Sequence, residues 1–196
     1  METETLINLP QTREARTTSV AANLVKTLLQ IIVIWGLFLW VIPMLIVRVE
    51  MLAAIPTFAT STWQIVGLLL FMAMSTLGLV CVSIFVWLGH GTPLPMDTAT
   101  RFVVAGPYRH IRNPMAIAGL GQGFAAALVL GSYLSILYVF MGVLVWNFIA
   151  RPWEEADLVK RFGSTYLDYQ ARVRCWIPTF RPYPCVIAEH AAIEAE

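Results

Sequence analysis

The most restrictive feature of the sequence is an apolar stretch, residues 115–150, that contains no Asp, Glu, Lys or Arg. A membrane-spanning helix needs about 20 apolar residues, so a run of this length is too long for one span and fits two. A Gly-Ser-Tyr sequence at residues 131–133 favours a turn in its middle. One face of the first arm carries small residues at every fourth position: Gly119, Gly123, Ala127 and Gly131. Such a face lets a neighbouring helix approach closely, and we therefore predict a tight helical hairpin.

Two further apolar stretches precede this hairpin. Residues 27–47 are bracketed by Lys26 and Arg48, and residues 64–89 are long enough to cross roughly 30 Å of hydrocarbon with some tilt. With 58% hydrophobic and only 13% charged residues, the chain is predicted to be an integral membrane protein. The expected fold is all-α, a bundle of about four transmembrane helices followed by a cytosolic amphipathic helix.

The basic residues are distributed unevenly along this predicted topology. Three precede the first span, three lie in the loop at 90–114 and six follow residue 150, whereas Arg48 alone lies on the opposite side. By the positive-inside rule, both termini are expected in the cytosol. We divide the chain into a cytosolic lead-in (1–25), one transmembrane domain (26–180) and a flexible tail (181–196).

The pattern changes after residue 150. Apolar residues then recur at intervals of three and four: Leu158, Phe162, Tyr166, Tyr169, Val173 and Trp176. This period predicts an amphipathic helix, whose apolar stripe we interpret as packing or interfacial anchoring and not as a substrate groove. Pro152 suits the first turn of a helix and predicts a bend at the end of the fourth span. The polar side chains of Gln122 and Asn147 are expected to face the bundle interior, with Asn147 bordering any cavity there.

Several classes of function are disfavoured. A net charge of +1 gives no reason to expect nucleic-acid binding, and the three cysteines have no paired metal-binding spacing, so no metal is expected. The glycines at 119, 121 and 123 lie in a charge-free span and indicate helix packing, not a nucleotide loop. The sequence shows no alternation of strand and helix patterns, so a soluble dinucleotide-binding fold is not expected.

Two polar stretches interrupt the apolar chain. They are residues 106–114 (Gly-Pro-Tyr-Arg-His-Ile-Arg-Asn-Pro) and residues 153–158 (Trp-Glu-Glu-Ala-Asp-Leu). Both adjoin span ends on the basic side, so they are expected at the same membrane face. Taken alone, the arginines of the first stretch satisfy the positive-inside rule, and Arg151 with Glu155 forms an ion pair at the i,i+4 spacing.

Taken in order, the motifs are more specific. Together with Gly-Thr-Pro-Leu-Pro at 91–95, Phe-Gly at 162–163 and Arg-Cys-Trp-Ile-Pro at 174–178, the two stretches closely resemble the isoprenylcysteine carboxyl methyltransferase and phospholipid methyltransferase family, especially its bacterial branch. The resemblance covers about residues 60–180. It implies a membrane bundle whose last two spans and cytosolic segments enclose S-adenosylmethionine. It also implies a lipophilic acceptor that enters from the bilayer.

The resemblance also implies which residues contact the cofactor. They are Thr100, Arg101, Phe102, Val103, Tyr108, Arg112, Asn113, Pro114, Met115, Ala116 and Glu154. Two positions depart from the eukaryotic prenylcysteine enzymes: Ala116 replaces a tyrosine, and Ala150 replaces the arginine of the acceptor site. Arg151 lies one step further on, roughly 100° around a helix.

The chemistry leaves the acceptor open. A carboxylate acceptor needs no base, whereas an amine or thiol must lose a proton, for which His110 and Glu155 are the candidates near the motifs. Arg151 is the candidate acceptor contact if the bend at Pro152 turns it into the direction of position 150. Otherwise a prenylcysteine carboxylate is not the acceptor, which is the interpretation that we favour. We therefore expect S-adenosylmethionine-dependent methyl transfer to a lipophilic acceptor, a carboxylate being one possibility. The alternatives are N-methylation of a phospholipid or other amine, and a non-catalytic membrane binding module that keeps the fold.

Overall fold

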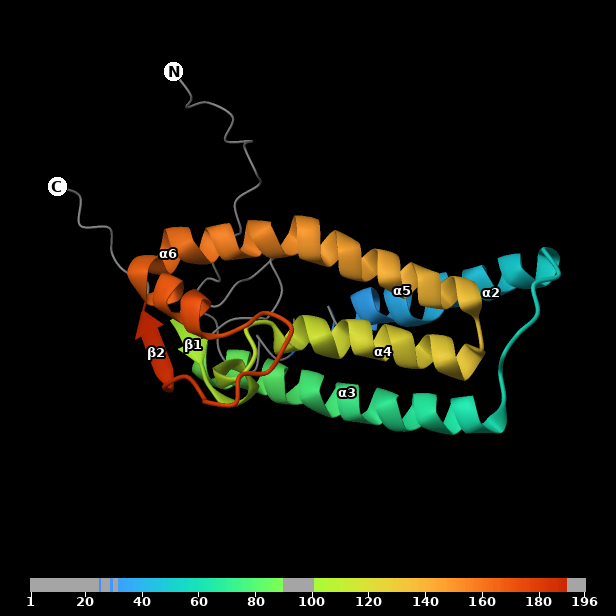
Figure 1. The fold of residues 1–196 in the computed structure, drawn as a ribbon, viewed down its shortest axis with the longest axis horizontal. Coiled ribbons are helices and arrows are strands. Elements are labelled where there is room, and N and C mark those ends of the chain that lie inside the picture. The colour runs from blue at the N-terminus through green and yellow to red at the C-terminus, as the bar shows by residue number, and fades with distance from the viewer. Residues whose placement is uncertain (1–24, 26–28, 30–31, 90–100, 190–196) are drawn as a thin grey trace, which may run out of the picture.

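The computed structural model describes residues 32–89 and 101–189, together with positions 25 and 29. In chain order the elements are a π-helical turn η1 (Gly36–Val41), α2 (Ile42–Leu52), α3 (Ser61–Leu88), β1 (Arg101–Val104), a 3-10 turn η2 (Gly106–Arg109), α4 (Pro114–Leu130), α5 (Tyr133–Val145), a second π-helical turn η3 (Trp146–Ala150), α6 (Arg151–Arg172) and β2 (Val186–Glu189). The long helices lie side by side, with the two strands gathered at one end of the bundle (Figure 1).

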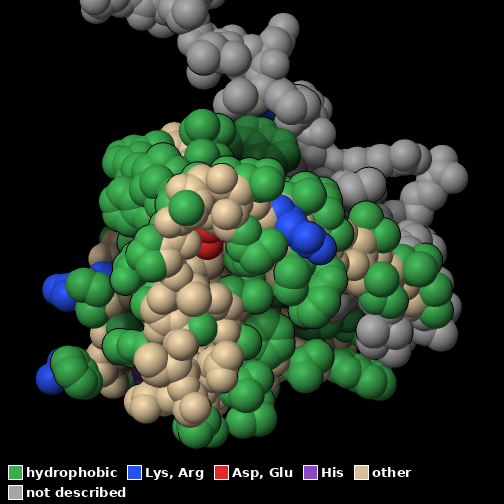
Figure 2. Space-filling model, turned by 90° about the vertical axis from the view of Figure 1, so that its right-hand side faces the viewer, with side chains coloured by type: hydrophobic (Ala, Val, Ile, Leu, Met, Phe, Trp, Pro, Cys, Tyr) green, Lys and Arg blue, Asp and Glu red, His purple; other side chains and the backbone are tan. Residues whose placement is uncertain are grey.

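The predicted all-α membrane fold is confirmed. Within the described residues, three helices are long and apolar enough to span a membrane: Ile32–Leu52, Ser61–Leu88 and Tyr133–Arg172. The shorter apolar helix α4 has 17 residues and is about 25 Å long, which is close to the thickness of a hydrocarbon core. Viewed from the end where α4 meets α5, the flanks of the molecule are mostly hydrophobic (Figure 2). We take residues 133–150 as the spanning part of the last helix, because the polar stretch begins beyond them.

The hairpin between α4 and α5 turns at the expected place. Gly131 adopts the left-handed conformation (φ 62°, ψ 35°), which a residue without a Cβ reaches at little cost. Ser132 follows as the N-cap of α5, and its hydroxyl accepts a hydrogen bond from the amide of Ser135 at 2.9 Å. At the same end, the buried carboxylate of Glu50 accepts a hydrogen bond from the amide of Leu134 at 2.7 Å. These contacts satisfy two of the free amides at the start of α5.

Among the helix pairs, a glycine brings the backbones of α3 and α4 close together, and this contact is not within the α4–α5 hairpin. A Cβ at Gly67 would come within 2.8 Å of both the carbonyl oxygen of Ala125 and Cγ2 of Val129. The small-residue face of α4 instead receives side chains, with Trp35 beside Gly119 and Val139 beside Gly123. Small residues thus position α4 on both sides.

A methyl group at Gly67 is therefore expected to separate α3 from α4. Gly67→Ala should lower the free energy of unfolding by about 1–3 kcal/mol, because the clashing oxygen belongs to a helix backbone that cannot turn aside. Gly36→Ala is the matched control, since a Cβ there meets nothing within 4 Å. Thermal unfolding in detergent compares the two variants. Equal melting temperatures would contradict this account of the packing.

The polar residues inside the spans are placed as expected in one case of two. Gln122 is buried, accepts a hydrogen bond from the indole of Trp35 and donates one to Ser75 Oγ at 2.8 Å. Asn147 does not border the cavity described below; its side-chain oxygen accepts a hydrogen bond from the indole of Trp176 at 2.9 Å. The sequence predicted an interior polar group but not its partner.

The bend expected at Pro152 is not the main break in the last helix. The chain stays helical through this position, because η3 shifts the hydrogen-bonding register and the Arg151 amide bonds to the Trp146 carbonyl. The helical path breaks at Gly163 instead (φ 51°, ψ −130°). The apolar stretch and the polar stretch after it therefore form one continuous rod up to residue 162.

A small sheet and an aromatic core close the bundle at this end. Strands β1 and β2 pair antiparallel, with Phe102 opposite Ala188. The buried core beneath them consists of Cys81, Phe102, Val104, Tyr108, Phe162, Tyr166, Tyr169, Val173 and Tyr183. Part of the segment that was expected to be a flexible tail is therefore packed on the bundle: residues 186–189 form a strand, and Tyr183 is buried. A four-residue strand is too short to show a periodic pattern in the sequence.

Candidate functional site

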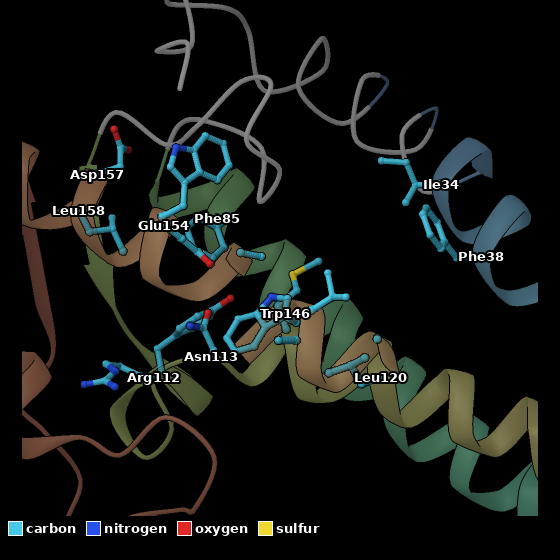
Figure 3. A pocket seen from close by; sticks show the side chains of 18 of the residues that line it. Ile34, Phe38, Phe85, Arg112, Asn113, Leu120, Trp146, Glu154, Asp157 and Leu158 are labelled. Carbon is cyan, nitrogen blue, oxygen red and sulfur yellow. The ribbon is translucent and has the colours of Figure 1, made fainter. Parts of the chain in front are cut away.

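A cavity of about 710 Å³ lies between the first span, the start of α4 and the last helix. Its polar end is lined by Arg101, Tyr108, Arg112, Asn113, Trp153, Glu154, Asp157 and Arg161. Its apolar arm is lined by residues of the spans, among them Ile34, Trp35, Phe38, Leu39, Gly119, Leu120, Gly123, Val139, Gly142 and Val145. Ile34 and Phe38 lie on one side of this space, with Trp146 and Glu154 on the other (Figure 3). The cavity therefore joins a polar end to the apolar interior of the bundle.

The inner side of the loop 106–113 forms the polar end. Tyr108 is buried, and its ring packs edge-on against Phe85 with centroids 5.3 Å apart. The hydroxyl of Tyr169 donates a hydrogen bond to the Tyr108 carbonyl oxygen at 2.7 Å and so fixes the turn. Burial, followed by the neighbouring Cys81 thiol, raises the pKa of Tyr108 well above its usual range. Tyr108 therefore presents a neutral phenol and an aromatic ring to the cavity.

The outer side of the same loop is held by the C-terminal segment. Nε of Arg109 donates a hydrogen bond to the Tyr183 carbonyl oxygen at 2.7 Å. The ring of His110 does not line the cavity, because its Nδ1 lies 2.9 Å from the carbonyl oxygen of Thr179. The structure places His110, a candidate base from the sequence, behind the cavity wall.

Arg112 connects the loop to the last helix through its side chain. Its guanidinium lies 3.1 Å from the Glu155 carboxylate and donates a hydrogen bond to the Gln170 carbonyl oxygen at 2.8 Å. Gln170 in turn donates to Glu155 at 2.9 Å. Figure 3 shows the guanidinium pointing away from Glu154 and Trp146. The prediction of an ion pair between Arg151 and Glu155 is therefore wrong, because Glu155 pairs with Arg112 from the loop.

The last helix presents one face to the cavity. Ala150 and Glu154 are one turn apart and both line it, whereas Arg151 and Glu155 do not. The side chain of Glu154 is exposed because it stands in this open space, and Figure 3 shows it directed there beside Asn113. Because the helix continues through Pro152, Arg151 is not turned into the position that Ala150 occupies.

Most of the cofactor contacts implied by the resemblance lie together on the cavity wall. These are Arg101, Phe102, Val103, Tyr108, Arg112, Asn113, Met115, Ala116 and Glu154. Pro114 is buried in the first turn of α4 and is absent from the lining, and Thr100 lies outside the described residues.

Sequence reasoning missed a second set of lining residues on α6. They are Asp157, Leu158, Arg161, Phe162, Tyr166 and Tyr169. Arg161 is buried, lies 3.6 Å from Asp157 and stacks its guanidinium over the Phe162 ring at 4.9 Å. The stripe interpreted as packing is therefore both core and cavity wall. The signal was available, because positions 150, 154, 157, 158 and 161 share one helical face.

The donor set fits S-adenosylmethionine. The volume lies within the range of small-molecule sites, about 300–1,000 Å³. Rings from Phe102 and Tyr108 offer surface for an adenine, Glu154 offers a carboxylate for hydroxyl or ammonium groups, and Arg161 offers a cation for a carboxylate. A polar end of this kind, continuous with an apolar arm inside a membrane bundle, defines a membrane enzyme that brings a polar cofactor to a lipophilic acceptor.

Comparison with known families agrees with this description. The family model described as phospholipid methyltransferase matches residues 63–165, which is 103 of the 196 residues. The protein belongs to the phospholipid methyltransferase family, and it is an S-adenosylmethionine-dependent methyltransferase and a multi-pass membrane protein. No curated protein and no solved structure gives a significant match.

Proposed function

We propose that the protein transfers the methyl group of S-adenosylmethionine to an amine in the headgroup of a membrane lipid. The observation that carries this proposal is the composition of the cavity wall along the last helix. Ala150 stands where the prenylcysteine enzymes that the sequence resembles have an acceptor-binding arginine, and the next polar side chains on this face are Glu154 and Asp157. Beside position 150, the wall therefore favours a cationic headgroup over an anionic one, because the lining cation of this helix, Arg161, lies two turns beyond Glu154.

The apolar arm supports a lipid as the source of that headgroup. Its lining residues belong to the spans and include Phe38, Leu120 and Val145, so acyl chains would meet apolar side chains at the depth of the hydrocarbon core. A water-soluble amine would gain nothing from this part of the cavity. A lipid with its headgroup at the polar end matches both halves of the lining.

Electrostatics distinguish an amine from a carboxylate acceptor. An ammonium group is attracted by aromatic faces and by carboxylates, and both line the polar end through Trp153, Glu154 and Asp157. An acceptor carboxylate would require a cation near position 150, but Arg151 does not line the cavity and Arg112 is engaged by Glu155.

The chain's own residues supply alignment and proton transfer. S-adenosylmethionine supplies a methyl group activated by its sulfonium. Tyr108 and Asn113 line the cavity on the side of the loop, and Glu154 lines it on the side of the helix, so they would orient the cofactor between them. An ammonium must lose a proton before it accepts a methyl group, and Glu154, one turn from Ala150 on the wall, is the carboxylate for this step, whereas Asp157 is paired with Arg161. His110 and Glu155, which the sequence suggested as bases, lie off this wall.

The orientation proposed from the basic residues is consistent with this function. The loop 106–113 and the polar part of α6 lie at the same end of the bundle, which the positive-inside rule assigns to the cytosol. Both termini would then be cytosolic, where S-adenosylmethionine is made available to the polar end.

The acceptor class is tested by transfer of a labelled methyl group from S-adenosylmethionine into a total lipid extract in nanodiscs. We expect the label in a lipid fraction that survives alkaline treatment, because a methylamine is stable to base. Release of the label as volatile methanol would identify a methyl ester and contradict the amine proposal. Ala150→Arg is a matched variant, which we expect to lower transfer to an amine lipid because it places a cation beside a cationic headgroup.

A further inference from the structure

The segment between α6 and β2, residues 173–185, contains no helix or strand but is firmly held. We name it the C-terminal loop. The amide of Thr179 donates a hydrogen bond to the His110 carbonyl oxygen at 2.8 Å, and the amide of Tyr183 donates to the Arg109 carbonyl oxygen at 2.8 Å. The carbonyl oxygen of Arg174 accepts from the amide of Arg112 at 3.0 Å. Three backbone hydrogen bonds along its length fix the path of this loop against the loop 106–113.

The C-terminal loop presents large apolar side chains outward from this fixed backbone. Ile177 is 59% exposed and Phe180 is fully exposed, and the prolines at 178 and 182 are exposed beside them. Because the backbone is held on both sides of Phe180, this ring cannot turn into the core by a simple change of loop conformation. Exposed apolar groups on a fixed loop indicate an apolar environment outside the protein.

The depth of the C-terminal loop follows from Trp176. Its ring packs on Trp146 with centroids 5.1 Å apart, and its indole donates to Asn147. Both partners lie within the last turn of the spanning part of the last helix, so Trp176 lies at the boundary between hydrocarbon and headgroups. Tryptophan is enriched at this level of a membrane. Ile177 follows Trp176 directly, and Phe180 lies three residues further along the same loop.

The charge of the C-terminal loop selects the kind of surface. Residues 173–185 contain two arginines, Arg174 and Arg181, both exposed, and no Asp or Glu. The nearest ion pair, Arg172 with Asp168 at 2.8 Å, is already neutral as a unit. Two exposed cations that flank apolar side chains at the interface match the phosphates of anionic lipids.

We propose that the C-terminal loop is an interfacial anchor that binds the surface of an anionic bilayer. Ile177 and Phe180 enter the boundary between headgroups and acyl chains, and Arg174 and Arg181 contact anionic headgroups. Because the loop also holds the outer side of residues 106–113, lipid binding stabilises the wall of the cavity from behind.

A fluorescent label at position 177 tests the depth of this loop. The Cys185→Ser background removes the exposed cysteine, and Cys81 and Cys175 are buried, so a Cys introduced by Ile177→Cys is labelled selectively. In nanodiscs of anionic lipid, the emission maximum of the attached dye should shift to shorter wavelength. Lipids that carry a nitroxide near the headgroup should quench this emission. The matched control is Lys160→Cys, which lies about 15 Å beyond residue 150 on the continuous helix and should report water.

The two arginines test the choice of lipid. Arg174→Gln with Arg181→Gln should weaken docking of the labelled loop on anionic bilayers by up to about 25-fold, because each cation near such a surface contributes about fivefold. Quenching in neutral bilayers should be weaker and should not change with these substitutions. A label at 177 that behaves like the label at 160, or quenching that is independent of lipid charge and of both arginines, would overturn the proposal. An unchanged melting temperature shows that each variant is folded.

Discussion

Replacing Glu154 by Gln is expected to weaken the binding of S-adenosylmethionine by about 10- to 100-fold. The physical reason is that hydrogen bonds to a charged group contribute about 1.5–3 kcal/mol. The amide keeps the shape while it removes the charge, which Glu154 carries above a pKa of about 7 because desolvation by the surrounding protein raises that pKa. Glu154 stands in the cavity, exposed and directed beside Asn113. The cofactor carries two positive groups and two ribose hydroxyls, so a carboxylate on the wall has partners to bind. Calorimetry on protein in nanodiscs measures the change.

The control for this prediction is another carboxylate on the same helix. Asp168→Asn changes a group that pairs with Arg172 and Tyr183 and does not line the cavity. The affinity of the Asp168→Asn variant for S-adenosylmethionine should equal that of the unmodified protein. If Glu154→Gln also binds as tightly as the unmodified protein, Glu154 does not contact the cofactor and the assignment of the helix side of the cavity is wrong.

The fold was predictable from the sequence because the membrane imposes a simple pattern. A charge-free run with a Gly-Ser turn at its centre admits only a hairpin, and the structure turns at Gly131. The sequence did not reveal the sheet, because strands β1 and β2 have four residues each and no periodicity to recognise. It also did not show that α4 approaches α3 closely, since a helix with small residues on more than one face does not specify its neighbour.

The sequence predicted which residues belong to the candidate site better than it predicted the contacts between them. Tyr108, Asn113 and Glu154 come together on the cavity wall. Their motifs lie at the ends of spans that meet at the same end of the bundle, so their order along the chain was enough to group them. The partner of Glu155 was not predictable in the same way. Rules for side-chain pairs within one helix favoured Arg151, but the guanidinium of Arg112 arrives from the loop and outcompetes it. Tertiary contacts of this kind leave no trace in local spacing.

The ion pair between Arg112 and Glu155 carries the second large prediction. Only 11% and 13% of these side chains is exposed, so removal of one partner leaves a nearly buried charge without compensation. Arg112→Met and Glu155→Leu are each expected to lower the free energy of unfolding by about 3–5 kcal/mol. The double variant should recover most of this loss, because apolar side chains of similar size can replace a buried pair. Denaturation of all four proteins in detergent gives the coupling between the two residues.

An exposed ion pair on the same helix is the control for this cycle. Arg172→Gln removes a cation that is 65% exposed, and it should leave the melting temperature unchanged because exposed pairs contribute little. The cycle also separates the two roles considered for Glu155. A positioning role predicts that stability falls with Glu155→Leu and returns in the double variant. If Glu155→Leu instead keeps full stability and loses methyl transfer, Glu155 is a base in the reaction, and Arg112 does not depend on it to hold the loop against the last helix.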